Sequence, residues 1–255
     1  MIIAVAGKGG TGKTSLLALI LDELARLRYP GRILAVDGDP AQTLSLALGV
    51  TAPLATVAEV REATSLDART IHSLPAGMTP AGYLLTQLRQ AGVLAPSRLR
   101  SLRFELLVMG AGTGPGCYCQ VNAALKSILT GLVSRYDLVL VDNDAGLEHL
   151  SRYRLGRIDL LLPVATPTRA AQLVAGRVVE TARAVGIELG DVWPIYNQTP
   201  LTFMPPETSG PVAIIPRALE MVRLEQQGRP VVDLSDDDPV REALRGIVER
   251  VRSCV

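Results

Sequence analysis

Several features that mark whole classes of protein are scarce in this sequence. Its 255 residues include three cysteines, one tryptophan and two phenylalanines, and its longest apolar stretches are far shorter than the ~18 residues that cross a membrane. So few cysteines exclude a secreted scaffold held by disulfides, and we therefore expect a reducing, cytoplasmic location. We also expect no membrane partner, because no stretch is long and apolar enough to span a bilayer.

Charge of neither sign is in excess. Lysine and arginine number 26 against 25 aspartates and glutamates, which gives a net charge of +1. Proteins that bind polyanions usually carry an excess of positive charge, so we predict no nucleic-acid partner. With 48% hydrophobic residues the chain has enough apolar material for a sizeable core, and we expect a single domain over residues 1–255.

Short runs rich in Val, Ile and Leu alternate with stretches of helical periodicity. The runs lack the polar alternation of half-exposed strands, which is typical of parallel strands covered on both faces. The pattern predicts an α/β fold with a doubly wound, mainly parallel sheet. Residues 51–103 are less regular and could hold helices or a small hairpin. We expect strands at 2–6, 32–37, 105–110, 137–142, 159–164, 192–197 and 212–216, and helices at 16–27, 121–132 and 171–185.

The C-terminal stretch has a helix start signal. Asp238 is a plausible N-cap and Pro239 fits the first helical position. The apolar residues that follow fall on one helical face, while Glu242 and Glu249 dilute the basic character of the opposite face. The pattern predicts a terminal helix that packs on the core rather than on a membrane.

A glycine-rich loop follows the first expected strand and precedes the first expected helix. Its sequence, Gly7-Lys8-Gly9-Gly10-Thr11-Gly12-Lys13-Thr14, fits the phosphate-loop pattern G-x-x-x-x-G-K-[ST] in the required context. The glycines let backbone N–H groups point at anionic oxygens, and the helix N-terminus adds its dipole. We expect Lys13 to meet the β- and γ-phosphates of ATP and Thr14 to bind magnesium. The residues expected to contact the nucleotide here are Gly9, Gly10, Thr11, Gly12, Lys13, Thr14 and Ser15.

Lysine is rare in this chain, and its placement is informative. Of the 26 basic residues only three are lysine, and two of these, Lys8 and Lys13, lie in the glycine loop. A compact ammonium fits among phosphate oxygens where a planar guanidinium does not. The distribution therefore indicates that geometry, and not only charge, is required at both positions.

Carboxylates end two of the expected strands. Asp37 and Asp39 close the second strand, and Asp142 closes the fourth after four apolar residues. Nucleotides bind at the C-terminal ends of strands in open α/β sheets, so these side chains can reach the magnesium side of a bound nucleotide. We expect Asp37 and Asp142 to lie in the first or second coordination shell of magnesium.

With Lys8 directly after the first glycine, the loop resembles the deviant Walker A motif of the family that contains the nitrogenase iron protein and the septum-site and chromosome-partitioning ATPases. This resemblance implies an ATPase that closes as a homodimer around ATP, with Lys8 reaching the partner's nucleotide. It also implies that Asp142 is a Walker B aspartate and that Asp39 orients the attacking water. The catalytic residues would then be Lys8, Lys13 and Asp39.

The same resemblance supplies two further nucleotide contacts. Gly146 would sense the γ-phosphate from the second switch, and Asn197 would read adenine. A proline motif near adenine matches Ile215-Pro216, although Arg217 follows where the family usually has a tyrosine or an acidic residue.

Two of the cysteines, Cys117 and Cys119, lie in a second glycine-rich loop with C-x-C spacing. A disulfide between residues i and i+2 would be strained, so metal binding is the more natural use of the thiols. Soft thiolates suit zinc, nickel or copper(I), but two of them cannot complete a four-sulfur site. A dimer axis beside the loop would supply four.

The segments Gly116-Cys117-Tyr118-Cys119 and Asp142 to Leu150 resemble the CooC-type ATPases, which insert nickel into carbon monoxide dehydrogenase and acetyl-CoA synthase. The resemblance implies a metallochaperone that binds nickel, or zinc as isolated, through Cys117 and Cys119 of both subunits. It implies apo carbon monoxide dehydrogenase or acetyl-CoA synthase as the recipient. ATP and magnesium are the expected cofactors.

Two other functions remain open from the sequence. One is a partitioning or positioning switch of the MinD and ParA kind, which would use the same dimer to bind another surface. The other is an electron-transfer ATPase like the nitrogenase iron protein. The latter would place a second cluster ligand after the Walker B strand, where residues 143–146 contain no cysteine.

Overall fold

The computed structural model describes residues 1–39, 41–53, 55–63, 73–110, 130–143, 156–206 and 210–253. The strands are β1 (Ile2–Ala6), β2 (Ile33–Asp37), β3 (Leu94–Leu99), β4 (Leu102–Val108), β5 (Leu138–Asp142), β6 (Arg157–Ala165), β7 (Glu188–Val192), β8 (Ile195–Thr199) and β9 (Ala213–Pro216). The helices are α1 (Lys13–Arg26), α2 (Leu44–Leu48), α3 (Val57–Ala63), α5 (Pro80–Gln90), α8 (Arg169–Ala184), α9 (Leu219–Gln226) and α10 (Pro239–Arg252), with a 3₁₀ turn, η1 (Val231–Asp233).

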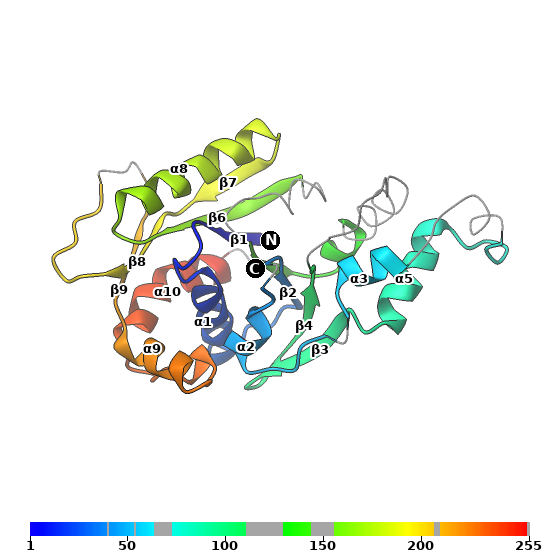
Figure 1. Ribbon diagram of the computed structural model, residues 1–255, viewed down its shortest axis with the longest axis horizontal. Coiled ribbons are helices and arrows are strands. Elements are labelled where there is room, and N and C mark those ends of the chain that lie inside the picture. Colours follow the sequence, from blue (N-terminus) through cyan, green and yellow to red (C-terminus); the bar gives the residue numbers. More distant parts are fainter. Residues whose placement is uncertain are drawn as a thin grey trace.

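The strands within these ranges form one sheet in the order β3-β4-β2-β5-β1-β6-β8-β9, and β7 also pairs with β6 (Figure 1). β3 and β4 pair antiparallel, and the other described pairs are parallel. This confirms the expected doubly wound, mainly parallel α/β sheet. The carboxyl ends of β1, β2 and β5 therefore lie side by side at one edge of the sheet.

Helices cover both faces of the sheet, and the first strand shows how its residues divide between them. Ile3 and Val5 belong to the core beneath α1 and α10, whereas Ala4 and Ala6 belong to the core beneath α3, α5 and α8. All four residues are fully buried. Because both faces are apolar, the strand shows no polar alternation, which is the signal that predicts a covered parallel sheet.

One expected strand is in fact two. The sequence predicts a single strand at 192–197, but β7 ends at Val192 and β8 begins at Ile195, with Trp193 and Pro194 between them. Both strands pair with β6, one after the other along its length. The sequence does not predict β7, because Glu188, Gly190 and Asp191 give this strand a polar composition.

The irregular segment 51–103 contains both kinds of structure that its sequence allows. The described part holds the helices α3 and α5, and β3 then turns back on β4 as a hairpin at the sheet edge. β4 begins at Leu102, three residues before the expected strand. Of the helix expected at 121–132, residues 121–129 lie outside the described residues, and helical structure is present at 130–133.

The C-terminal helix begins where the sequence predicts. The Asp238 carboxylate accepts a hydrogen bond from the backbone N–H of Val240 at 2.9 Å, and Pro239 occupies the first turn. The apolar face of α10 is fully buried and packs with α1 and β9. The prediction of a core-packing helix is confirmed. No described helix is long and apolar enough to cross a membrane.

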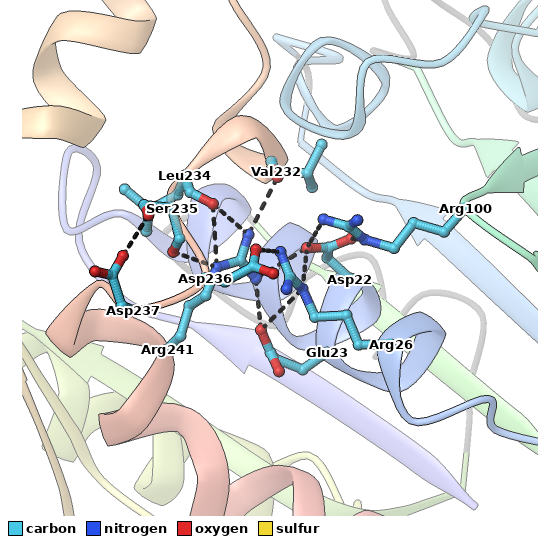
Figure 2. A network of polar contacts seen from close by, with 10 residues as sticks. All are labelled: Asp22, Glu23, Arg26, Arg100, Val232, Leu234, Ser235, Asp236, Asp237 and Arg241. Carbon is cyan, nitrogen blue, oxygen red and sulfur yellow. Dashed lines mark hydrogen bonds and ion pairs between the residues drawn. The ribbon is translucent and has the colours of Figure 1, made fainter.

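A buried ion network fastens α1 to two distant segments (Figure 2). Asp22 of α1 accepts hydrogen bonds from Arg100 in the β3–β4 turn (Oδ1 to Nε, 2.5 Å) and from Arg26 (Oδ2 to Nε, 3.1 Å). It also forms an ion pair with Arg241 of α10 (Oδ2 to Nη1, 2.9 Å). Burial raises the pKa of Asp22, but the hydrogen bonds from Arg100 and Arg26 outweigh it and leave the pKa below its usual value.

Arg241 extends this network into the turn before α10. Its guanidinium also donates to the backbone carbonyls of Val232 (3.1 Å) and Leu234 (2.8 Å). The side chain is almost fully buried, so these bonds satisfy donors that water cannot reach. The network thereby fixes the C-terminal half of the helix that starts at the glycine loop.

Candidate functional site

The glycine loop lies between the end of β1 and the start of α1 and folds around one carbonyl oxygen. The backbone oxygen of Lys8 accepts from the backbone N–H of Thr11 (3.3 Å), from the Thr11 hydroxyl (2.8 Å) and from Nζ of Lys13 (3.4 Å). Lys13 is buried, whereas Lys8 is exposed. The two lysines therefore differ in environment: one belongs to the interior of the loop, and the other reaches solvent.

The start of α1 is arranged to receive an anion. Gly12, at the N-cap, has a left-handed backbone (φ 87°) and offers no side chain to cap the first turn. No acidic residue occupies that turn. The positive end of the helix dipole and the first backbone N–H groups are thus left for a ligand in the loop, as in other phosphate sites.

Asp142 ends β5 directly beside this helix start. Its Oδ2 accepts from the hydroxyl of Thr14 at 2.5 Å, while its Oδ1 is buried and has no hydrogen-bond partner among the described residues. Burial, together with the charge of Asp37, raises the pKa of Asp142 to about 7, against a smaller lowering by Thr14 and Lys13. A buried carboxylate oxygen without a partner is the kind of group that a cation would satisfy.

Asp37 ends β2 next to β5 and is fully buried, but both of its oxygens have partners. Oδ1 accepts from the backbone N–H of Asp39 (3.1 Å), and Oδ2 accepts from that of Leu44 (3.0 Å). Burial raises its pKa to about 6, although these two hydrogen bonds act in the opposite direction. Asp37 therefore organises the segment after β2 and presents no unpartnered oxygen to the site.

The segment after β2 crosses the end of β5 at close range. The backbone N–H of Gly38 donates to the backbone oxygen of Asp142 at 2.8 Å, and a Cβ at Gly38 would come within 2.7 Å of that oxygen. Asp39 follows, with Oδ1 accepting from the N–H of Ala41 at 2.8 Å. Any larger residue at position 38 would force apart the two strand ends that carry the carboxylates.

A further strand end contacts the loop from the opposite side. The side-chain amide of Asn197, on β8, donates to the backbone oxygen of Thr11 at 2.7 Å. Its nitrogen would lie 2.4 Å from a Cβ at Gly12, so position 12 admits only glycine on spatial as well as conformational grounds. Directly after the neighbouring strand β9, the backbone N–H of Arg217 donates to the backbone oxygen of Thr199 at 3.1 Å, which places Arg217 beside the end of β8.

Within the described ranges no group of three or more His, Cys, Asp or Glu side chains is placed to hold a metal ion. This does not conflict with a magnesium site, because magnesium is commonly held by one or two carboxylates and by the phosphates of its nucleotide. Thr14 and Asp142 have the chemistry that such a site requires. Gly146, Cys117 and Cys119 lie outside the described residues.

A family model, the CobQ/CobB/MinD/ParA nucleotide binding domain, matches residues 2–243. The chain belongs to this family. It is thus a nucleotide-binding P-loop ATPase, which agrees with a glycine loop, a helix start and two carboxylate-bearing strand ends gathered at one edge of a parallel sheet.

Relatives of this ATPase include proteins of known and unknown role. An uncharacterized ATP-binding protein of Methanocaldococcus jannaschii is 30% identical over 258 residues, which is 98% of each chain. The carbon monoxide dehydrogenase accessory protein CooC of Rhodospirillum rubrum is 30% identical over 192 residues, covering 74% of this chain and 71% of that protein. The cell division ATPase MinD of Pyrococcus furiosus shares the fold, with a TM-score of 0.68 at 20% identity over 100% of this chain and 99% of that one.

Sequence reasoning missed two residues at the site of this ATPase. Asn143 is fully buried, with its amide nitrogen donating to the backbone oxygen of Val5 at 3.2 Å and its Oδ1 unpartnered among the described residues. Gln198 donates to the backbone oxygen of Gly10 at 3.3 Å. Asn143 lies within the segment from Asp142 to Leu150 that resembles the CooC-type ATPases, but the resemblance assigned it no role. Gln198 belongs to no motif, and only the neighbouring Asn197 could have drawn attention to it.

Proposed function

We propose that this ATPase is a nickel metallochaperone, which binds the metal between two copies of the chain and supports its insertion into carbon monoxide dehydrogenase or acetyl-CoA synthase. The observation that carries the proposal is the match to the carbon monoxide dehydrogenase accessory protein CooC over 74% of the chain, in a sequence that has the C-x-C pair Cys117 and Cys119. Nickel, or zinc in its place, is the cargo of this reaction.

The thiol pair requires a dimer. Two thiolates from one chain leave a soft divalent ion half coordinated, whereas two chains related by a twofold axis supply four. Lys8 supports the same arrangement, because it is exposed at the rim of a loop whose other lysine is buried. In a face-to-face dimer Lys8 would reach the partner's triphosphate and stabilise charge in phosphoryl transfer.

The remaining roles follow from the contacts within one chain. Lys13 leaves the carbonyl of Lys8 to bind the β- and γ-phosphates, and the backbone from Gly9 to Ser15 surrounds them. Thr14 and Asp142 hold magnesium, which neutralises phosphate charge when bound. Asp37 acts from the second shell, because backbone N–H groups already occupy both of its oxygens.

Three further residues have roles in hydrolysis and in adenine binding. Asp39 orients the attacking water, and its place after Gly38 brings it to the strand end that bears Asp142. Gly146 senses the γ-phosphate. The Oδ1 atom of Asn197 reads adenine while its amide nitrogen stays on the loop.

Metal analysis combined with sizing tests the proposal. Wild-type protein is mixed with nickel and a non-hydrolysable ATP analogue, beside the Cys117→Ser/Cys119→Ser variant and a Cys254→Ser control. We expect one nickel per dimer in wild type and in the control, and none in the double variant. A wild-type protein that stays monomeric with both ligands would show the proposal to be wrong.

A positioning switch of the MinD and ParA kind is the second candidate, favoured by the fold shared with MinD over the whole chain. Such a switch would use its nucleotide-dependent dimer to bind another protein or a surface. The terminal helix does not support a switch that binds a membrane, because the apolar face of α10 is already buried on α1 and β9. Delivery of nickel to an apo carbon monoxide dehydrogenase, measured as recovered activity, separates the two candidates.

A further inference from the structure

Two neighbouring residues of β8 bind two neighbouring carbonyls of the glycine loop. Asn197 donates to the oxygen of Thr11 at 2.7 Å, and Gln198 donates to the oxygen of Gly10 at 3.3 Å. Successive side chains of a regular strand point to opposite faces of the sheet. A regular β8 could therefore direct only one of the two amides at the loop.

The backbone of β8 is irregular at this point. Its register against β9 shifts between Tyr196 and Thr199, and Gln198 has a left-handed backbone with φ 59°. A residue other than glycine adopts this conformation at an energetic cost, and bulges of this kind re-aim side chains near functional sites. The irregularity turns the Gln198 side chain to the same side as that of Asn197.

The two bonds hold the loop's peptide planes from outside the loop. Within the loop, the Gly10–Thr11 peptide has a hydrogen bond from its N–H to the carbonyl of Lys8, at 3.3 Å. Gly9, Gly10 and Gly12 give the loop wide conformational freedom, and Gly10 itself has φ 78°. Because the C=O and N–H groups of a trans peptide point in opposite directions, an oxygen held toward β8 turns the N–H of the next residue away from β8. A carbonyl that rotated inward would instead face the phosphate oxygens and repel them.

We infer that Gln198 is a positioning residue of the phosphate loop, placed by the β8 bulge to hold the Gly10 carbonyl away from the bound triphosphate. Its contact is with the loop and not with the base, so it acts on any ligand that fills the loop. The inference rests on nucleotide binding alone and is independent of the proposed nickel function.

The decisive experiment uses two ligands that share the phosphates but differ in the base. Gln198→Met keeps the length of the side chain and removes its donor. Dissociation constants are measured by calorimetry for a non-hydrolysable ATP analogue and for inorganic tripolyphosphate. We expect both ligands to bind about fivefold more weakly, by the same factor, because one hydrogen bond that orders the loop is lost. The melting temperature of the ligand-free protein should not fall.

Two variants separate positioning from relief of backbone strain. Gln198→Gly removes the amide and also relieves the left-handed conformation, so we expect a higher melting temperature together with the same loss of affinity. Arg28→Gly is the matched control, since Arg28 is exposed at the end of α1 with φ 53° and lies outside the loop. It should gain stability and keep wild-type affinity for both ligands.

Three outcomes would overturn the inference. Wild-type affinity of Gln198→Met for both ligands would show that the bond does not order the loop. A loss confined to the ATP analogue, with tripolyphosphate unaffected, would assign Gln198 to the base. An equal loss of affinity in Arg28→Gly would show that any change of backbone strain has this effect.

Discussion

A buried carboxylate lies near each end of helix α1, and the two have opposite electrostatic environments. Near the C-terminal end, Asp22 is fully buried and receives hydrogen bonds from the guanidinium groups of Arg26 and Arg100, with Arg241 as a further ion-pair partner, and its pKa lies below the usual value. Near the N-terminal end, Asp142 is equally buried, has only the Thr14 hydroxyl as a partner among the described residues, and its pKa rises to about 7.

This difference separates a structural charge from a functional one. A buried charge destabilises a fold unless another group compensates it. At Asp22 the chain supplies the compensation from three segments and gains a connection between them. At Asp142 the chain leaves an oxygen unpartnered within its described part, and a cation that arrives with the nucleotide can complete the site.

Removing the compensated charge of Asp22 should have the largest effect, which is on the free energy of unfolding. Asp22→Asn leaves the buried guanidinium of Arg241 without one of its counter-charges and should lower the free energy of unfolding by about 3 kcal/mol. ATP hydrolysis per folded molecule should stay near wild type. Denaturant titration and a steady-state ATPase assay measure the two quantities.

The control for this variant is Glu242→Gln, which breaks an exposed pair with Arg245 on α10. Exposed pairs contribute ~0–1 kcal/mol, so the unfolding free energy should change by no more than that. Equal effects of the two substitutions would contradict the structural role of the Asp22 network.

Removing the uncompensated charge of Asp142 should raise the stability of the ligand-free protein instead of lowering it. Asp142→Asn keeps an acceptor for Thr14 but removes the charge, so we expect turnover with magnesium and ATP to fall by about 100-fold. At pH 8 the ligand-free variant should be more stable than wild type by ~1 kcal/mol, because the folded state no longer holds an ionised carboxylate at a site that disfavours it. A variant less stable than wild type at this pH would contradict the comparison.

The pH dependence of stability sharpens the contrast. The pKa of Asp22 is lowered on folding, so its contribution is present above the unfolded value of 3.8 and is lost as the pH falls through the folded pKa. The pKa of Asp142 is raised, so its penalty is full above pH 7 and disappears as the pH falls from 7 toward 4. Unfolding free energies from pH 3 to pH 8 should show the Asp22→Asn deficit shrinking only below pH 4 and the Asp142→Asn gain shrinking between pH 7 and pH 4.

The smallest effect concerns the outermost member of the Asp22 network. Arg100 has a left-handed backbone (φ 53°) in the β3–β4 turn and is partly exposed. Arg100→Ala and Arg100→Gly both lose the ion pair, but glycine adopts this conformation without strain. We expect the glycine variant to be more stable than the alanine variant by about 0.5–1 kcal/mol in urea titration. An order reversed between the two would show that the turn is not held in this conformation.

Local pattern predicts much of the fold, because the signals involved are short in range. Runs such as Ile2–Ala6 and Leu138–Asp142 are apolar on both faces, and this alone predicts covered parallel strands. The strand at Glu188–Val192 escapes prediction because its polar composition is tolerated at a position next to β6 that only the folded sheet defines. For residues 51–103 the sequence allows either helices or a hairpin. The β3–β4 hairpin is not singled out, because its place at the sheet edge is likewise defined only in the folded sheet.

The candidate site also has a part that the sequence predicts and a part that it does not. The order of residues in the chain is enough to place Lys13, Thr14 and Asp142 at one sheet edge, since a loop after β1 and the end of an adjacent parallel strand must meet there. Nothing in the sequence indicates that Asp37 uses both oxygens to bind backbone N–H groups, or that Gln198 reaches Gly10 across 188 positions. Those contacts depend on distances between strand ends.

What the sequence determined by itself is the type of protein: a phosphate loop between a buried strand and a helix, in a chain whose apolar pattern predicts a covered, mainly parallel sheet. What the tertiary structure decided is which charges are compensated. Burial and partnership are properties of three-dimensional neighbours, and Asp22 and Asp142 acquire opposite electrostatic roles only when arginines from distant segments gather around one and not around the other.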